Sequence, residues 1–344
     1  MLRNFSLKAG LLIVIALLCM GVPIVNSEGT TVASLVSPTT EYLTSVFMLS
    51  PSNGWAVGHE GMIIHWDGTD WSIVASPTTA HLYSVYMVSD SDGWAVGASG
   101  MIIRWDGISW KAVISPTTSW LNSIHMLSAS NGWAVGTSGT MIHWDGTEWS
   151  TVTSPTTEEL TSVFMADAVD GWAVGYGGEI IRWDGIEWFS VTSPTTTIAL
   201  FSVFKFITPE DGWAVGYGGE IIRWNGVEWY MVASPTTENL YSVDMVSDSD
   251  GWAVGSDGTI IHWNGSDWNI VTSPTTQHLF EVAMTGTDDG WAVGKDGAII
   301  RWTGVQWIPE FSTVIIIPLL IYLTLITVIL AKTTSKQRKP TTHN

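Results

Sequence analysis

The chain has 344 residues, 46% of them apolar, with 22 tryptophans and one cysteine. This apolar content excludes an intrinsically disordered chain, and a single cysteine excludes a disulfide framework. All 32 acidic residues lie between Glu28 and Glu310, but only seven of the 13 lysines and arginines do, so this stretch carries a net charge of −25. Such a charge disfavours nucleic acid and anionic headgroups as partners, and favours basic partners, cations or a saline exterior.

The N-terminus has the layout of a secretory signal peptide. Arg3 and Lys8 precede an apolar run over residues 11–25, and small or permissive residues follow at Val25 and Ser27. We expect a signal peptide over residues 1–27, cleaved after Ser27, with an uncleaved signal anchor as the alternative. Because Cys19 lies inside this segment, the exported domain must be held together by packing.

The central part of the chain consists of seven copies of one sequence repeat. Gly-Trp-Ala-Val-Gly begins at Gly54, Gly93, Gly132, Gly171, Gly212, Gly251 and Gly290. Ser-Pro-Thr-Thr also occurs seven times, beginning at Ser37, Ser76, Ser115, Ser154, Ser193, Ser234 and Ser273. A period of about 40 residues marks repeated supersecondary units, none of which can bury its apolar faces alone.

Each unit contains four short strands and no room for a helix. In the first unit, apolar or β-branched runs cover residues 43–48, 55–57, 62–66 and 71–75. Turn residues separate them at 50–53, 58–61 and 67–68. The middle strands are continuously apolar, as expected when both faces of a sheet are covered. The sequence therefore predicts an all-β fold, a seven-bladed β-propeller of four-stranded antiparallel blades over residues 28–308.

The ends of the repeat suggest how the ring closes. The first Ser-Pro-Thr-Thr precedes the first unit, and the seventh unit lacks one because the chain runs from Trp307 into Pro309. Residues 31–37 resemble a detached fourth strand, with Val32 where other units have tryptophan. We therefore expect this N-terminal strand to complete the last blade and hide its edge.

Twenty-one tryptophans follow the repeat, three in each unit, for example Trp55, Trp66 and Trp71. They are either stacking platforms for sugars or packing between blades, and their recurrence in every unit favours packing. Before the second tryptophan stands a cationic or titratable residue: His65, Arg104, His143, Arg182, Arg223, His262 and Arg301. This ring could bind an anion or respond to pH, but pairing with acids at the blade rims is favoured.

Asp or Asn precedes every Gly-Trp, which turn geometry explains. Asp90 with Asp92 and Asp248 with Asp250 hint at a calcium loop, but the downstream bidentate Glu is missing. Histidine spacing gives no zinc cluster, so we expect neither a metal nor a cofactor. Asn264-Gly-Ser266 is a glycosylation sequon that also occupies a hairpin-turn position.

Specificity is expected where the copies differ. In a propeller, the turns after Gly-Trp-Ala-Val-Gly and the links after Ser-Pro-Thr-Thr should share one face, and this mixture of aromatic and charged residues suits peptide or carbohydrate recognition. Trp120, the only tryptophan outside the framework, is the sharpest candidate, with neutral drift of an exposed loop as the alternative. Extra residues at 197–200 and 207–210 could shape one side of the mouth. The predicted ligand-binding face comprises Glu41, Tyr42, His59, Glu60, His81, Trp120, Glu158, Glu159, Tyr176, Ile198, Tyr217, Glu238, Asn239, Asp257, Gln277, His278, Lys295 and Asp296.

The C-terminus is predicted to anchor the protein. An uncharged apolar run over residues 311–331 is long enough to cross a hydrocarbon core, and Lys332, Lys336, Arg338 and Lys339 follow it. The basic cluster should stay cytoplasmic. We therefore expect a transmembrane anchor over residues 309–331, a basic cytoplasmic tail over residues 332–344, and the propeller outside the cell.

The Gly-Trp-Ala-Val-Gly block, a glycine three residues later, Ile-Ile and a turn before tryptophan resemble the BNR-type repeats of sialidase-like propellers. Residues 43–307 are most similar to the photosystem II stability and assembly factor family, except for a shorter turn at residues 66–71. This resemblance implies a non-enzymatic, protein-binding propeller. Pro309-Glu310-Phe311 before the apolar span resembles an archaeal surface-sorting signal of the PEF type, which implies that the anchor is cut and the protein transferred to a lipid.

Catalysis is the competing interpretation. A sialidase-type glycosidase needs several arginines around one substrate carboxylate, but the four arginines of residues 28–310 occupy one framework position on separate blades. Near-identical units also lack the asymmetry that a nucleophile and an acid require. We therefore expect a cell-surface binding or scaffolding propeller, with protein or glycan ligands, and no enzyme activity. The alternatives are a sialidase-like hydrolase and an assembly factor for a membrane complex.

Overall fold

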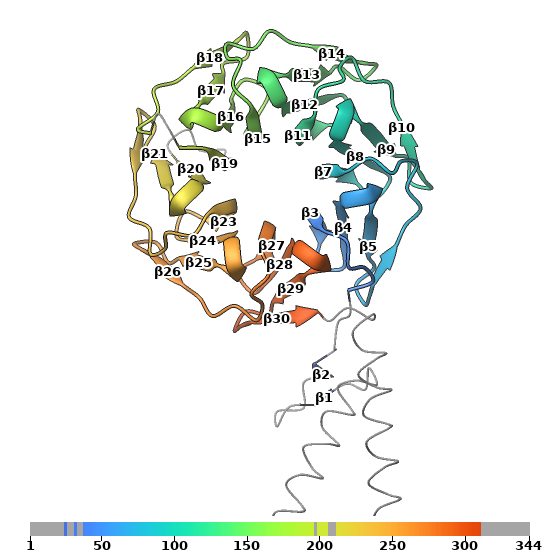
Figure 1. Cartoon of the computed structure of the whole chain (residues 1–344), viewed down its shortest axis with the longest axis vertical. Helices are drawn as coiled ribbons and strands as arrows, with labels where there is room; N and C mark the ends of the chain where they lie inside the picture. Colours follow the sequence, from blue (N-terminus) through green and yellow to red (C-terminus); the bar gives the residue numbers. More distant parts are fainter. Residues whose placement is uncertain (1–23, 26–30, 33–36, 196–197, 206–210, 311–344) are drawn as a thin grey trace, which may run out of the picture.

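Seven four-stranded antiparallel sheets stand like blades around a central axis (Figure 1). The computed structural model describes residues 24–25, 31–32, 37–195, 198–205 and 211–310. Each blade uses four strands that follow one another in the chain, and each strand pairs with the next in sequence. The predicted all-β, seven-bladed propeller is confirmed.

The first four blades have these bounds. Blade 1 contains β3 (Leu43–Ser50), β4 (Asn53–Gly58), β5 (Ile63–Trp66) and β6 (Trp71–Ile73). Blade 2 contains β7 (Leu82–Ser89), β8 (Asp92–Gly97), β9 (Ile102–Trp105) and β10 (Trp110–Ala112). Blade 3 contains β11 (Leu121–Ser128), β12 (Asn131–Gly136), β13 (Met141–Trp144) and β14 (Trp149–Thr151). Blade 4 contains β15 (Leu160–Met165), β16 (Gly171–Gly175), β17 (Ile180–Trp183) and β18 (Trp188–Ser190).

The remaining three blades repeat the pattern. Blade 5 contains β19 (Leu200–Lys205), β20 (Gly212–Gly216), β21 (Ile221–Trp224) and β22 (Trp229–Met231). Blade 6 contains β23 (Leu240–Ser247), β24 (Asp250–Gly255), β25 (Ile260–Trp263) and β26 (Trp268–Ile270). Blade 7 contains β27 (Leu279–Gly286), β28 (Asp289–Gly294), β29 (Ile299–Trp302) and β30 (Trp307–Glu310).

The Gly-Trp-Ala-Val-Gly block is the buried second strand of every blade, and both of its glycines are explained by close contacts. A Cβ at Gly54 would lie 2.2 Å from the sulfur of Met48, which packs on the glycine. A Cβ at Gly58 would lie 1.8 Å from the carbonyl oxygen of Tyr42. A larger residue at Gly58 would push the preceding link away, and one at Gly54 would displace the end of the Met48 side chain, so close packing favours glycine at both positions.

Tryptophans form the contact between blades. The indole of Trp55 lies 4.8 Å from that of Trp105 and 5.5 Å from that of Trp110, measured between ring centroids. The same contact recurs at all seven interfaces, including the last one, where Trp291 lies 4.8 Å from Trp66. The prediction that these tryptophans serve packing is confirmed.

The residue before the second tryptophan pairs with the Asp or Asn before Gly-Trp in the same blade. Each arginine pairs with an aspartate, as in the 2.8 Å contact of Arg104 Nε with Asp92 Oδ1. In blades 1 and 3 the histidine is hydrogen-bonded to asparagine, as in the 2.9 Å bond between His143 Nε2 and Asn131 Oδ1. In blade 6 the histidine pairs with Asp250. The other pairs are His65–Asn53, Arg182–Asp170, Arg223–Asp211 and Arg301–Asp289.

Five of these pairs confirm the predicted pairing with an acid, whereas His65 and His143 bind asparagine instead. The pairs also correct the interpretation of the Asp and Asn residues before Gly-Trp. Among the described residues with positive φ, none is an Asp or Asn preceding Gly-Trp, so left-handed turn geometry does not explain them. They recur in every copy because each binds the arginine or histidine side chain on the neighbouring strand. Asp92 and Asp250 of the weak calcium hint each use Oδ1 in such a pair, and calcium binding there is not tested.

The predicted closure by an N-terminal strand is wrong. The fourth strand of blade 7 is β30, from the C-terminal side of the same unit, and it reaches two residues into the segment expected to form the anchor. Pro309 is tolerated there because β30 is the outer edge strand. Thr31–Val32 instead forms β2, which pairs with β1 (Ile24–Val25) in a separate two-stranded sheet.

Blades 7 and 1 are joined by the same tryptophan contacts as every other pair of blades, with one changed hydrogen bond. The first Ser-Pro-Thr-Thr reaches back to blade 7, where the carbonyl oxygen of Thr39 lies 2.1 Å from the position that a Cβ on Gly297 would take. The Val46 amide donates a 2.7 Å hydrogen bond to Glu281 Oε2. The ring therefore closes by docking of blade faces, without an exchanged strand.

The predicted targeting segments fall mainly outside the described residues. This holds for residues 1–23 of the signal peptide and for all of the anchor and tail after residue 310. In the part of the chain that the structure describes, no helix is both long and apolar enough to span a membrane.

Two glycine substitutions test the closure. Gly218 and Gly297 both have a φ near +70°, but a Cβ at Gly218 would meet nothing within 4 Å. We expect Gly218→Ala to lower the free energy of unfolding by about 1 kcal/mol, the cost of a left-handed backbone. Gly297→Ala should lower it by about 3 kcal/mol, because its Cβ also overlaps Thr39. Chemical denaturation measures both, and equal losses would contradict the proposed role of Thr39.

Candidate binding face

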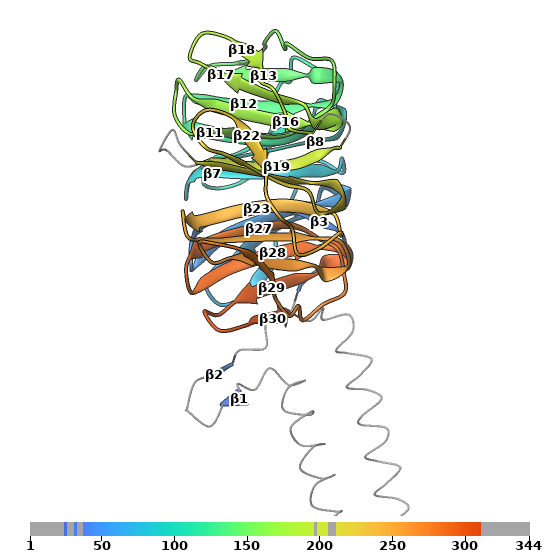
Figure 2. The same ribbon diagram turned by 90° about the vertical axis from the view of Figure 1, so that its left-hand side faces the viewer.

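Both variable segments lie on one face of the ring, at one side of the disc in Figure 2. The turns after Gly-Trp-Ala-Val-Gly are short 3₁₀ segments: η1 (His59–Gly61), η2 (Ala98–Gly100), η3 (Thr137–Gly139), η4 (Tyr176–Gly178), η5 (Tyr217–Gly219), η6 (Ser256–Gly258) and η7 (Lys295–Gly297). The first amide of each turn donates to the carbonyl just before the first strand, as Thr137 does to Trp120 at 3.0 Å. A backbone hydrogen bond therefore ties each variable turn to the variable link of the same blade.

An arc of aromatic rings follows this face from blade 4 round to blade 2. Tyr42 stacks on His59 with ring centroids 4.9 Å apart, and His59 lies 4.3 Å from His81. Lys295 Nζ lies 6.0 Å from the Tyr42 ring. Burial, followed by the nearby His81, lowers the pKa of His59, so this imidazole is neutral at pH 7. The rest of the arc runs through Phe280, Tyr241, Phe201 and Tyr176.

A second group surrounds Trp120 on blades 2 to 4. The Trp120 side chain is 50% exposed, and its ring lies 5.8 Å from that of Tyr83. Asn122 Nδ2 donates a 2.9 Å hydrogen bond to Glu159 Oε1. Burial and then the Glu159 carboxylate raise the pKa of Tyr83, which keeps its hydroxyl protonated. This group therefore combines an accessible indole, a phenol and a carboxylate.

Some predicted residues have a structural task on this face. His81 Nδ1 accepts a 3.0 Å hydrogen bond from the Glu60 amide of the preceding blade, and His278 Nδ1 accepts one of 2.9 Å from the Asp257 amide. Others are open to solvent, such as Glu158 and the 59% exposed Tyr217. The extra segments at 197 and 207–210 lie outside the described residues.

Sequence reasoning missed the aromatic residues that complete both groups. Tyr83, Phe201, Tyr241 and Phe280 stand directly after the first leucine of the first strand, outside the turns and links that were expected to vary. In the other copies this position is Thr44, Asn122 or Thr161, which bond to the next blade. Variation at this position, within a strand that is otherwise repeated, was the signal that could have identified it.

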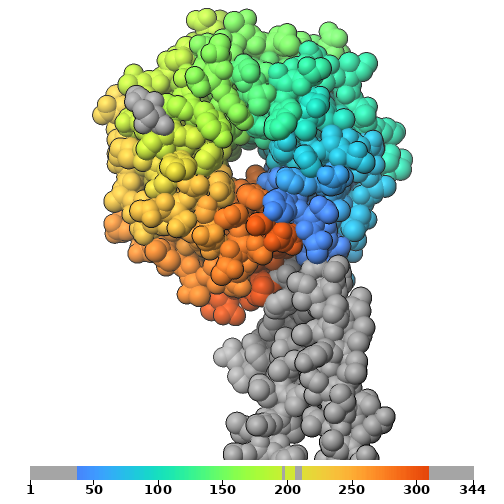
Figure 3. Space-filling view, viewed as in Figure 1, coloured from blue at the N-terminus to red at the C-terminus, as the bar shows by residue number. Residues whose placement is uncertain are grey.

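The central channel of the propeller is visible at the centre of the ring in Figure 3 and has a volume of about 520 Å³. Residues of all seven first strands line it. At one position of these strands, five side chains form a ladder of rings: Phe47, Tyr86, His125, Phe164 and Phe204, with centroids 4.5–5.0 Å apart. Burial lowers the pKa of His125 to about 3, so it is a neutral member of the ladder. Asp244 and Ala283 occupy the remaining two blades.

Two half-buried carboxyl groups interrupt the symmetry of the channel. At one position of the first strand, six blades use a serine hydroxyl to accept a hydrogen bond from the next blade's amide, as Ser242 does from Val282. Blade 7 has Glu281 instead. Burial raises the pKa of Glu281 to about 7 and that of Asp244 to about 6.

The described residues contain no group of three or more His, Cys, Asp or Glu side chains arranged to hold a metal ion. Asn264 of the sequon lies in an exposed turn, where its Oδ1 accepts from the amides of Ser266 and Asp267. Its modification stays a prediction.

Comparisons with solved structures agree on the fold. A structure titled "YCF48 bound to D1 peptide" superimposes with a TM-score of 0.66 at 18% identity, covering 78% of this chain and 94% of the other. YCF48 from Cyanidioschyzon merolae gives 0.65 at 18%, covering 77% and 97%. The WD40 propeller domain of Doa1 gives 0.61 at 14%, covering 78% and 95%. No protein-family model and no curated protein matches the sequence.

The carboxyl group of Glu281 should make stability depend on pH. Its pKa is raised from 4.5 to about 7 on folding, so the folded state binds this proton more tightly. Its contribution to stability is then full below pH 4.5 and is lost as the pH rises to about 7. Asp244 acts in the same direction.

The lowered pKa of His125 acts in the opposite direction over the same range, so the test compares variant with wild type. We expect the melting temperature of Glu281→Ser, which restores the residue of the other six blades, to rise relative to that of the wild type as the pH increases from 4.5 to 7. Thermal unfolding across this pH range measures it. An unchanged slope in the variant would show that Glu281 is not the group responsible.

Proposed function

We propose that this chain is a cell-surface, membrane-anchored propeller that binds a protein segment at the mouth of its channel and performs no chemistry itself. One observation carries the proposal. The residues that vary between otherwise identical blades gather on one face, where aromatic rings and charged groups surround the Trp120 and Tyr42 sites. Aromatic anchors with a polar surround are typical of protein-binding hot spots.

The surroundings of these anchors suit a peptide. Trp120 and Tyr217 offer exposed aromatic surface, while Glu159 and Lys295 supply opposite charges on the same face. The backbone beneath them is pinned by hydrogen bonds at every turn, so binding requires little ordering of the receptor. The solved YCF48 structure whose title names a bound D1 peptide supports protein binding by a propeller of this shape.

The arrangement of arginines argues against a sialidase-type enzyme. Within the described residues, each of the four arginines is paired with the aspartate of its own blade at 2.7–3.1 Å. Four groups that are held apart in this way do not converge on one substrate carboxylate. The signal peptide, the anchor and the exterior location rest on the sequence pattern at the two ends of the chain.

A peptide-library selection on the full-length chain tests the proposal. Peptides selected on the wild type should bind Trp120→Ala and Tyr42→Ala about tenfold more weakly, because truncating an aromatic hot spot removes most of its contact area. Val227→Ala, at an 83% exposed residue on the outer rim, should bind them unchanged. Calorimetric titration gives the affinities, and thermal unfolding verifies the fold.

Other results would redirect the proposal. If no peptide is selected while a glycan array gives ligands that need Trp120, the face recognises carbohydrate. If the selected peptides bind Trp120→Ala and Tyr42→Ala as tightly as the wild type, this face is not the binding site. Turnover of a sialoside would overturn the non-enzymatic interpretation.

A further inference from the structure

One difference between the blade interfaces is the residue before the second tryptophan, which is arginine or histidine. In blades 2, 4, 5 and 7 this residue is arginine, and in blades 1, 3 and 6 it is histidine. Each arginine lies over the Gly-Trp indole of its own blade, with Cζ 4.7–5.1 Å from the ring centroid. Most also reach the following blade: Arg104, Arg223 and Arg301 lie 5.6–5.8 Å from the second tryptophan there.

The exposure of this second tryptophan depends on whether the preceding blade carries arginine or histidine. After the four arginine blades, the indoles of Trp66, Trp144, Trp224 and Trp263 are 1–5% exposed. After the three histidine blades, Trp105, Trp183 and Trp302 are only half-buried. Histidine is shorter than arginine and stays over the indole of its own blade, as His143 does at 4.4 Å from Trp133. The position that a guanidinium covers elsewhere is therefore open.

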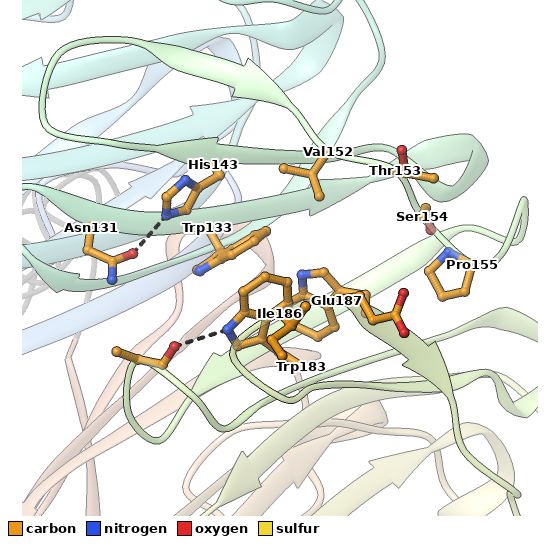
Figure 4. A pocket seen from close by; sticks show the side chains of 12 residues that line it. Asn131, Trp133, His143, Val152, Thr153, Ser154, Pro155, Trp183, Ile186 and Glu187 are labelled. Carbon is orange, nitrogen blue, oxygen red and sulfur yellow. Dashed lines mark hydrogen bonds between the residues drawn. The ribbon is translucent and has the colours of Figure 1, made fainter.

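Between blades 3 and 4 this opening is a pocket of about 580 Å³ (Figure 4). Its walls include the indoles of Trp133 and Trp183, the Asn131–His143 pair and the Glu187 side chain. The hairpin turns that bound it, at Ala168 and Ile186, lie on the face opposite the 3₁₀ turns. Its size is within the range of about 300–1,000 Å³ that small-ligand sites have. It is separate from the mouth.

We propose that this pocket binds the side chain of an arginine from a basic partner protein. The guanidinium would lie beside His143 and against the half-buried indole of Trp183. Arg104, Arg223 and Arg301 take the same position near the second tryptophan of the blade that follows them. The interaction is a cation–π contact, which a planar guanidinium forms better than an ammonium.

Charge around the pocket suits this occupant. Glu187 lines the opening, whereas the equivalent residues at the other two histidine interfaces are the uncharged Ser109 and Gln306. Burial lowers the pKa of His143, so its imidazole is neutral at pH 7 and does not repel a cation. The net charge of −25 over residues 28–310 attracts a basic protein from a distance.

The repeat itself supplies the test. Asn131→Asp with His143→Arg converts blade 3 into an arginine blade and should fill the pocket from within. Asp92→Asn with Arg104→His converts blade 2 into a histidine blade, which should uncover Trp144 beside Glu148. Both double variants copy pairs that other blades already contain, so both should fold.

The probe is an acetylated peptide of four alternating serine–arginine pairs, titrated calorimetrically into the full-length chain at low salt. We expect the blade 3 double variant to bind this peptide about tenfold more weakly than the wild type does. We also expect the wild type to bind the peptide with citrulline in place of arginine about tenfold more weakly than the arginine peptide. The blade 2 double variant should bind an additional equivalent of peptide. Trp120→Ala should bind as the wild type does, so failure here is distinguishable from failure at the mouth.

Two results would overturn the inference. One is unchanged affinity in the blade 3 double variant while its melting temperature matches that of the wild type. The other is equal affinity for the arginine and citrulline peptides. Binding of a methyl glycoside that the blade 3 double variant abolishes, without binding of the arginine peptide, would assign the pocket to carbohydrate instead.

Discussion

The structure depends on one contact, the packing of a tryptophan from the second strand of each blade against two tryptophans of the next blade. It occurs at all seven interfaces and leaves the second-strand indoles at most 4% exposed. A four-stranded blade has no core of its own, because its apolar faces are covered only by its neighbours. Large aromatic surfaces supply that cover over a wide area, without a disulfide.

Ring closure follows from the same contact. Trp291 meets Trp66 and Trp71 as any other pair of blades would, so the last interface needs no exchanged strand. Where the copies depart from the repeat, polar groups are added to this frame. Lys205 replaces the methionine of the other blades and places Nζ 2.6 Å from Asp170, while Glu281 replaces a serine at the closing interface. The scaffold accommodates these changes because its tryptophan contacts are unaltered.

Much of the fold could be predicted from the pattern. The four strands of each unit, the packing role of Trp55 and its equivalents, and the shared face of the variable turns all follow from periodicity and residue type. The pairing of Thr31–Val32 with Ile24–Val25 could not be predicted, since a short apolar segment fits several sheet edges equally well. The partners of Asp92 and its equivalents were also missed, because residues 12 apart in sequence meet only across a hairpin.

By itself, the sequence determined the number of blades, the strand order within each and the positions free to vary, because a repeat constrains every copy alike. The tertiary structure decided which of those varied positions act together. Tyr83 reaches Trp120 from another blade, and His143 rather than arginine uncovers Trp183 across an interface. Such effects arise from distances between separate units, which no single copy of the repeat contains.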